Sequence, residues 1–348
     1  MLTIIVPTMN RLDYIVRLLT YYANTHCKYT ILIGDSSNAE IIEKTKKILE
    51  QFKGKLHIEH HEFPHLSVME CTIKLLNLVS TPYTAFLSDD DIITTRGLEQ
   101  CVEFLESHKD YAGAHGINVA YRLWSNSAYG KFLSCEYYRI TAVESEMPKE
   151  RLTEFLKDYS VILFSVCRTD VCKKMWDNGV KLADKAFAPE ILPNCVLVLH
   201  GKVKQLDCLF MVRQYHIKRY VYEPIDEWIR TSKYQQEYRL FRDHLVQELV
   251  QIEGITREEA TRIVDMAFKS YLDKFRNNPI TRMNIAMGYF PGVRSILRLM
   301  KYIVLSHSRD YLLPKLLNPS SPYYSDFLPA YHAITKPFSL QDKIIGGS

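Results

Sequence analysis

The sequence lacks the marks of a membrane-spanning, secreted or disulfide-stapled protein. Its longest apolar runs, such as Val161–Phe164 and Cys195–Leu199, are far shorter than the ~20 residues that cross a bilayer. Residues 1–28 contain no basic segment ahead of an apolar one, so we expect no secretory signal. The eight cysteines are scattered without a Cys-x-x-Cys pair, which favours buried, reduced thiols. We therefore expect a cytoplasmic protein.

Glycine-rich phosphate loops are also missing. No Gly-x-Gly-x-x-Gly or Walker A run is present, which excludes the dinucleotide-binding and P-loop classes. No nucleophile elbow supports Ser-His-Asp hydrolysis. The net charge is only +4, and the basic surplus lies in residues 280–348, with eight Lys or Arg against three Asp or Glu. A basic stripe for a nucleic acid would be larger and less local, so we expect no nucleic-acid partner.

What the sequence does contain is an alternation of short β-branched runs with amphipathic segments. At 348 residues the chain exceeds the roughly 250–300 residues of a single core, so we expect an α/β unit with an appendage. Strands alternating with helices predict a mostly parallel sheet covered by helices on both faces. The expected strands are Leu2–Val6, Tyr29–Ile33, Leu56–Glu59 and Tyr83–Leu87; the expected helices start after an Asn10 cap and cover about 38–53, Val68–Leu78 and about 96–107.

The regular alternation of strands and helices becomes less clear from about residue 111. Cys195–Leu199 and Leu206–Val212 fit either a strand or a helix, because periodicity alone does not separate them. We expect an α/β domain over 1–224, with halves 1–110 and 111–224, and a helical region over 225–348. The other expected elements are strands at Gly113–Tyr121 and Val161–Val166 and helices at about 149–158, around Trp176, at Glu227–Val250 and at Arg257–Phe275.

Polar and charged residues follow several of the expected strands. Pro7-Thr8-Met9-Asn10-Arg11 follows the first strand, Asp35 the second, and Asp89-Asp90-Asp91 the fourth. Ligands of open parallel sheets bind at the carboxyl ends of the strands, so these residues are expected to share one edge.

Three adjacent carboxylates repel one another, which is energetically unfavourable. Two like charges ~4 Å apart repel by about 4 kcal/mol at an effective dielectric of 20. A divalent cation relieves this repulsion, and an all-oxygen site suits Mg²⁺ or Mn²⁺. The alternative is that these acids cap or flank the start of the next helix.

The chain resembles the family 2 glycosyltransferases of GT-A fold in three segments. These are Ile4–Arg11, Ile33–Ser37 and Ala85–Asp91, and the likeness is strongest over residues 1–110. The resemblance implies an inverting, metal-assisted enzyme that uses a nucleotide-diphosphate sugar with Mn²⁺ or Mg²⁺. It also implies a UDP-linked donor, a glycan, lipid-linked or protein acceptor, and bacterial-type surface glycan or glycoconjugate synthesis.

The resemblance further implies roles for single residues. Pro7 would shape the turn after the first strand, and Asp35 would accept the imide N–H of the base. Asp90 would touch the ribose, and Asp91 would bind the metal. The residues expected to bind the nucleotide sugar are Pro7, Thr8, Arg11, Asp35, Lys74, Asp89, Asp90 and Arg213; those expected to bind the metal are Asp91 and His216.

Two positions depart from the family pattern. The family usually has an Arg-Asn pair before Gly where this chain has Thr72-Ile73-Lys74. Its common Asp-x-Asp-Asp motif would place Ser88 at the first Asp, whereas the triplet Asp89–Asp91 also reads as Asp-x-Asp. Both alignments keep Asp91 as the metal ligand.

An inverting transfer needs a carboxylate that takes the proton of the acceptor hydroxyl. The family places this base about a hundred residues after its metal motif, which points to Glu190 and, as the alternative, to Asp184. Glu190 would equally suit a solvated first helical turn after Pro189. Arg213 would neutralise the departing diphosphate beside His216, unless both form an exposed basic turn.

Two further patterns have competing interpretations. His57 and His61 would lie on one face of a strand and His60 on the other, which argues against a zinc site. Segment 293–306 carries an apolar stripe flanked by basic residues, which fits either an anionic membrane surface or packing in the domain or a homo-oligomer. Rival functions are a retaining transferase, a sugar nucleotidyltransferase and a non-catalytic nucleotide-sugar-binding scaffold.

Overall fold

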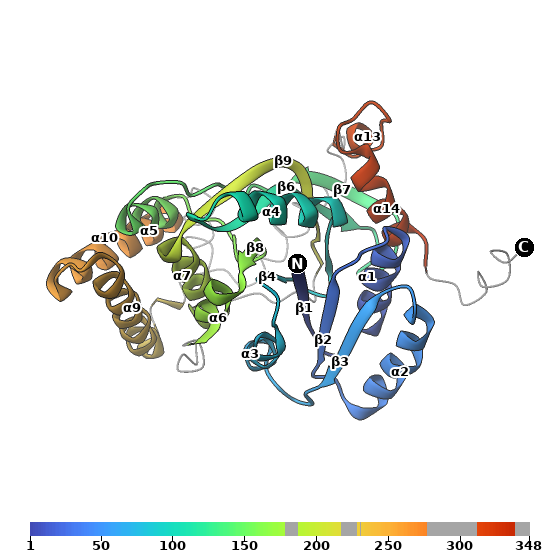
Figure 1. Ribbon diagram of the computed structural model, residues 1–348, viewed down its shortest axis with the longest axis horizontal. Coiled ribbons are helices and arrows are strands. Elements are labelled where there is room, and N and C mark those ends of the chain that lie inside the picture. The colour runs from blue at the N-terminus through green and yellow to red at the C-terminus, as the bar shows by residue number, and fades with distance from the viewer. Residues whose placement is uncertain (178–186, 217–227, 230, 277–311, 338–348) are drawn as a thin grey trace, which may run out of the picture.

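The computed structural model describes residues 1–177, 187–216, 228–229, 231–276 and 312–337. Its N-terminal part alternates strands and helices as expected (Figure 1). The elements are β1 (Leu2–Thr8), α1 (Leu12–Asn24), β2 (Thr30–Asp35), α2 (Ala39–Leu49), the 3₁₀ turn η1 (Glu50–Phe52), β3 (His57–Glu62), α3 (Val68–Leu78), β4 (Tyr83–Phe86), β5 (Asp91–Ile93) and α4 (Thr95–Ser107).

The second half adds longer strands and a different order of elements. Cys195–Leu199 lies in a helix and Leu206–Val212 in a strand, which resolves the two ambiguous segments. The elements are β6 (Tyr111–Leu123), β7 (Phe132–Tyr137), α5 (Pro148–Lys157), β8 (Val166–Arg168), α6 (Thr169–Asp177), the π-helical turn η3 (Phe187–Ile191), α7 (Leu192–His200) and β9 (Lys202–Gln214).

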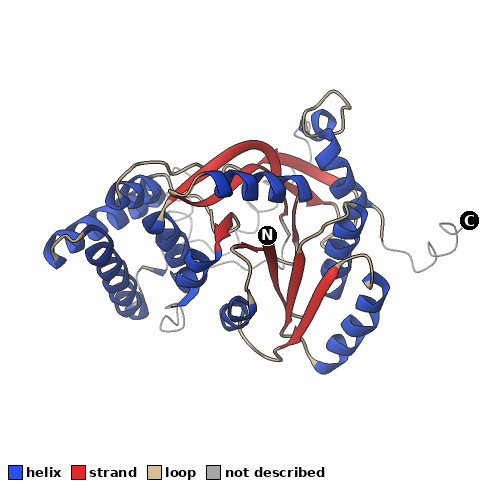
Figure 2. Ribbon diagram, viewed as in Figure 1, coloured by secondary structure: helices blue, strands red, loops and turns tan. Residues whose placement is uncertain are grey.

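All these strands form one nine-stranded sheet in the order β3-β2-β1-β4-β8-β6-β9-β5, with β7 paired to β6. The expected α/β sheet flanked by helices is confirmed (Figure 2). Strands β3, β2, β1 and β4 pair in parallel, and so do β6 and β9, whereas β8, β5 and β7 join antiparallel. Every residue of β1 is buried, as expected for a strand covered on both faces.

Two local predictions are wrong. Only Val166 of the predicted strand Val161–Val166 is in a strand, because the residues before it form a turn in which the Ser165 N–H donates to the Ile162 carbonyl at 2.9 Å. Asn10 does not cap α1, whose N-cap is Arg11. Asn10 has a left-handed φ of 55°, and its side-chain oxygen accepts the Asn38 N–H at 3.1 Å, so it ties the loops after β1 and β2 together.

The helices that the structure describes after residue 227 lie in two places (Figure 1). Helices α9 (Ser232–Glu253) and α10 (Arg257–Arg276) pack on α5 and α7. Helices α13 (Leu312–Leu316) and α14 (Tyr324–Thr335) lie at the other side of the sheet, against β7 and α1. Segment 293–306 lies outside the described residues.

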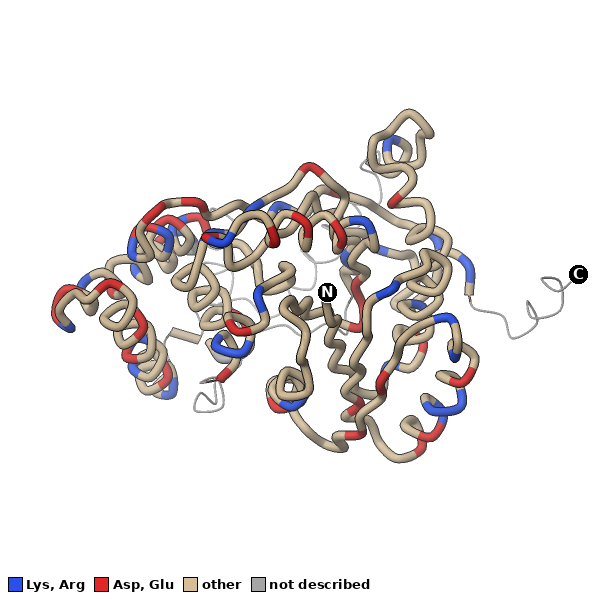
Figure 3. The backbone as a smooth tube through the Cα atoms, in the orientation of Figure 1, with Lys and Arg blue, Asp and Glu red and all other residues tan. Residues whose placement is uncertain are grey.

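Acidic and basic residues are interspersed along the outer helices, including α2, α9 and α10 (Figure 3). Within the described ranges, no helix combines the length and apolar character needed to cross a membrane.

Candidate active site

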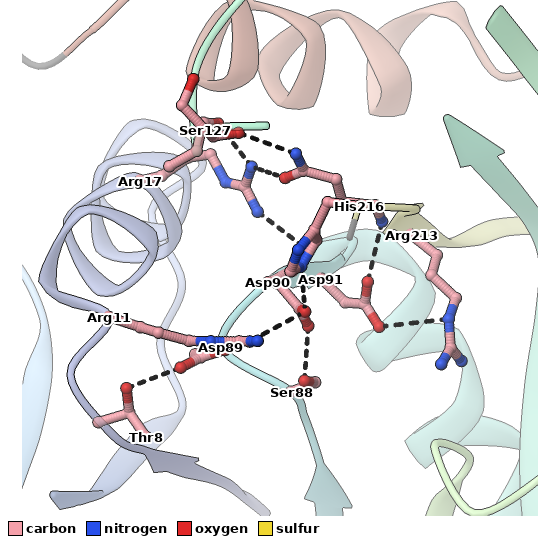
Figure 4. A network of polar contacts seen from close by, with 12 residues as sticks. Thr8, Arg11, Arg17, Ser88, Asp89, Asp90, Asp91, Ser127, Arg213 and His216 are labelled. Atoms are coloured by element: carbon pink, nitrogen blue, oxygen red, sulfur yellow. Dashed lines mark hydrogen bonds and ion pairs between the residues drawn. The ribbon is translucent and has the colours of Figure 1, made fainter. Parts of the chain in front are cut away.

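The ends of β1 and β4 meet through side chains. The Thr8 hydroxyl donates to Oδ2 of Asp89 at 2.7 Å. Nη1 of Arg11 donates to Oδ1 of Asp89 at 2.8 Å and to Oδ2 of Asp90 at 3.0 Å (Figure 4). The structure therefore brings together four of the residues that were expected at one edge of the sheet.

The end of β9 joins the same cluster. Nε2 of His216 lies 2.7 Å from Oδ2 of Asp90, whose other oxygen accepts the Ser88 hydroxyl at 2.6 Å. The imidazole stacks on the Tyr14 ring with 5.4 Å between centroids. Its Nδ1 is buried and has no hydrogen-bond partner among the described residues. His216 thus contacts Asp90 rather than Asp91.

Asp91 begins β5 and pairs in antiparallel register with Arg213. Its Oδ1 accepts the backbone N–H of Gln214 at 3.0 Å, and its Oδ2 lies 3.8 Å from Nε of Arg213. The guanidinium of Arg213 lies over the rings of Phe164 (4.8 Å) and Tyr138 (5.1 Å). Its Nη1 is buried without a partner in the described part of the chain.

The three neighbouring carboxyl groups differ in proton affinity. Burial, reinforced by the charge of Asp90, raises the pKa of Asp89 to about 6. Burial also raises the pKa of Asp91 to about 7, against the opposing charge of Arg213. Burial acts on Asp90 in the same direction, but the His216 hydrogen bond and the Arg11 charge outweigh it and lower its pKa. Asp90 is therefore the most firmly ionised acid of the three.

Asp35 lies beside Thr8, because β1 and β2 pair in that register. Its Oδ1 accepts the Ser37 N–H at 3.0 Å, and its Oδ2 lies 3.2 Å from Nε2 of His60. Burial would raise the pKa of Asp35, but these hydrogen bonds outweigh burial and lower it. The carboxylate is charged at neutral pH and held in a fixed orientation.

The sequence did not predict the contact of His60 with Asp35 or the position of Arg17 beside the acidic turn. Arg17 is fully buried on α1. It donates to the Asp90 carbonyl at 2.7 Å, to the Ala128 carbonyl at 2.6 Å and to Oε1 of Gln214 at 2.5 Å. The available signal was an arginine inside the apolar stripe of an amphipathic helix. His60 could be found only from the register of β2 and β3.

Pro7 and Lys74 lie away from the hydrogen-bonded cluster. Pro7 is inside β1, opposite Gly34 of β2, rather than in the following turn. The Lys74 ammonium on α3 lies 5.8 Å from the centre of the Phe63 ring. Their roles in nucleotide binding stay predictions.

Glu190 is partly buried and lies on η3, the π-helical turn before α7. Its Oε1 accepts the hydroxyl of Tyr159 at 3.0 Å. The Tyr138 phenol interacts electrostatically with Arg213, Glu190 and Asp91. Glu190 on η3 and Asp91 in the acidic cluster therefore share Tyr138 as a neighbour. Asp184 lies outside the described residues.

Comparisons with known proteins agree with this fold. Residues 3–166 match the family model described as Glycosyl transferase family 2. No curated protein sequence matches the chain. S. aureus TarS is similar in structure at 14% identity and a TM-score of 0.51, over 95% of this chain and 54% of the TarS chain. The chain thus spans about half the length of that protein. S. aureus TarS 1–349 in complex with UDP-GlcNAc is similar at 16% identity and a TM-score of 0.51, over 96% of this chain and 89% of that one.

The fold of this chain is therefore similar to that of TarS. Residues 3–166, just under half of the chain, are similar to glycosyltransferase family 2.

Proposed function

We propose that the protein transfers a sugar from a UDP-linked donor to an acceptor hydroxyl with inversion at the anomeric carbon. One observation carries the proposal: Thr8, Arg11 and the acidic turn are joined by hydrogen bonds at the sheet edge next to Asp35. The complex of the similar TarS 1–349 with UDP-GlcNAc supports the choice of UDP sugars as the first donors to test.

In this proposal, Asp35 accepts the imide N–H of uracil. Its lowered pKa supports the role, because an ionised carboxylate is an acceptor at neutral pH. Asp90 contacts the ribose, and the remaining donor-binding residues are Pro7, Thr8, Arg11, Lys74, Asp89 and Arg213.

The donor set at the acidic turn suits Mn²⁺ or Mg²⁺. Carboxylates and a neutral imidazole are ligands for such ions, and the buried Nδ1 of His216 is unpartnered among the described residues. In those same residues, no three His, Cys, Asp or Glu side chains form a complete cage. An Mn²⁺ or Mg²⁺ ion at this turn would therefore need further ligands beyond these residues. Asp91 and His216 would hold it, with Asp90 as the alternative carboxylate, and the ion would supply positive charge at the leaving group.

The chain's own residues then perform the transfer. The acceptor oxygen attacks the anomeric carbon as the bond from that carbon to the diphosphate oxygen breaks. Glu190 takes the hydroxyl proton. Arg213, whose pKa is raised by Asp91 against the effect of burial, stays charged and stabilises the negative charge of the departing diphosphate.

The expected acceptor is a glycan, a lipid-linked glycan or a protein, in bacterial-type surface glycan synthesis on the cytoplasmic side of a membrane. Peripheral contact through 293–306 and homo-oligomer formation belong to this proposal. A liposome flotation assay and a measurement of molecular mass in solution test them.

The proposal is tested by replacing the base. Glu190→Gln keeps the size of the side chain but removes its basicity, so turnover of UDP-GlcNAc should fall by roughly 10²–10⁴. Binding of UDP-GlcNAc, measured by calorimetry, should survive. Full turnover in this variant would overturn the role of Glu190, and a product with retained anomeric configuration by NMR would overturn inversion.

A further inference from the structure

Glu190 lies on a short backbone irregularity. The π-helical turn η3 precedes α7, and single π turns are frequent at functional sites. We propose that Tyr159 is a positioning residue for Glu190 and that helices α9 and α10 hold both residues in place. The inference rests on the role of Glu190 as the base proposed above.

The direction of the Tyr159 hydrogen bond follows from its neighbours. The Ile162 N–H donates to Oδ1 of Asn194 at 2.8 Å, which leaves the amide nitrogen of Asn194 as a donor. That nitrogen donates to the Tyr159 oxygen at 3.3 Å and to the Glu190 carbonyl at 2.7 Å. Because the Tyr159 oxygen already accepts a hydrogen bond, its own proton points to Oε1 of Glu190, 3.0 Å away.

A phenol that donates to one carboxylate oxygen has two effects on a general base. It favours the charged form of the carboxylate, which lowers its pKa. It also fixes the orientation of the carboxyl plane relative to the Tyr159 ring. Tyr159 can donate throughout the neutral range, because burial and the Glu190 charge raise its own pKa.

Several other ionisable groups in the described part of the chain lie near this pair. The phenols of Tyr138 and Tyr271 interact electrostatically with Glu190. The Cys195 thiol of α7 is close to Tyr159, and burial raises the pKa of that thiol. At the surface, Nζ of Lys274 contacts Asp158 at 3.1 Å and the Tyr159 carbonyl at 3.4 Å.

Helices α9 and α10 fix this arrangement through aromatic contacts. The Tyr271 ring of α10 lies edge-on to the Tyr159 ring, with 5.0 Å between centroids. Phe187, the first residue of η3, is fully buried. Its ring lies 4.6 Å from Phe241 of α9 and 5.7 Å from Phe268 of α10. Helices α9 and α10 therefore clamp both ends of the Tyr159–Glu190 contact.

The first test measures the carboxyl group directly. In protein labelled with ¹³C at the Glu side-chain carboxyl, the Glu190 signal is the one that Glu190→Gln removes. Tyr159→Phe keeps the ring and deletes the donor, so the Glu190 titration should move up by about one pH unit. Tyr111→Phe is the matched control, because that phenol donates to Glu144 at 2.6 Å on the surface. An unchanged Glu190 titration in Tyr159→Phe overturns the inference.

The second test measures turnover as release of UDP from UDP-GlcNAc. The acid limb of its pH profile should move up in Tyr159→Phe, with an unchanged dissociation constant for UDP-GlcNAc. Phe268→Leu should slow release without weakening binding, whereas the equally buried Phe327→Leu on α14 should not slow it. Equal rates in the two leucine variants overturn the clamp. If Glu190→Gln keeps full release, the base assignment fails, while a shifted Glu190 titration still supports the contact.

Discussion

Nε2 of His216 lies 2.7 Å from the carboxylate of Asp90, although 126 residues separate them. The contact joins the end of β9 to the turn after β4, and Arg17 supports it from α1. Arg17 binds the Asp90 carbonyl and the Gln214 side chain, while the Gln214 backbone N–H holds Asp91. The acidic cluster therefore depends on Arg17, a buried cation that does not contact the nucleotide sugar in our proposal.

Arg17→Met should destabilise the fold. The change removes the Arg17 donor from the buried carbonyls of Ala128 and Asp90, so the free energy of unfolding should fall by about 3 kcal/mol or more. Urea unfolding followed by circular dichroism measures the loss. The control is Arg96→Met, whose side chain is 58% exposed. Equal midpoints for the two variants would show that Arg17 is not structurally important.

Local sequence patterns predicted much of this molecule. The alternation of strands and helices identified β1 to β4, and the bounds of α3 match the prediction. Polar residues directly after strands predicted the meeting of Thr8 with the acidic turn, because strand direction alone decides which edge they share. Asn10 was mispredicted because its side chain binds the next loop instead of its own helix.

Contacts that depend on register and packing were not predictable in this way. His60 reaches Asp35 only because β3 pairs with β2 in one particular register. Tyr159 reaches Glu190 from a separate helix end, and no local spacing relates the two. The antiparallel pairing of β5 with β9, which places Arg213 beside Asp91, also arises from the whole sheet.

The cysteines should be unreactive in the native protein. All eight are free and buried, and burial raises the pKa of Cys27 and of Cys71 to about 11. Titration with Ellman's reagent at mildly alkaline pH should find no fast-reacting thiol in the folded protein and eight in guanidinium chloride. A fast-reacting native thiol would contradict the packing described above.

The contact between α7 and α9 should make stability depend on pH. The hydrogen bond from His200, at 2.6 Å, lowers the pKa of Glu248 against the opposing effect of burial. A lowered carboxyl pKa stabilises the fold above the ordinary value of 4.5, and this stabilisation is lost as pH falls through the folded-state pKa.

His200→Gln and Glu248→Gln should therefore each lower the unfolding free energy by about 1–2 kcal/mol at neutral pH. The difference in unfolding free energy between each variant and the wild type should become smaller at acidic pH. A double-mutant cycle from urea unfolding at several pH values measures the coupling. A coupling energy that does not change between neutral and acidic pH would contradict this assignment.

Asp91→Ala should weaken donor binding only when the metal is present. We expect the affinity for UDP-GlcNAc with Mn²⁺ to fall at least roughly 10-fold, and the affinity without Mn²⁺ to change little. Asp110→Ala is the control, because that surface acid pairs with Lys202 away from the cluster. An unchanged Mn²⁺ effect in Asp91→Ala would point to Asp90 as the metal-binding carboxylate.

The most direct test of the central claim is calorimetric titration of UDP-GlcNAc with Mn²⁺ into the wild type and into Asp35→Ala. The account predicts one site per chain in the wild type and a large loss of affinity in the variant, because the uracil loses its acceptor. Absence of binding in the wild type, or equal affinity in both proteins, would contradict a nucleotide-sugar site at this edge of the sheet.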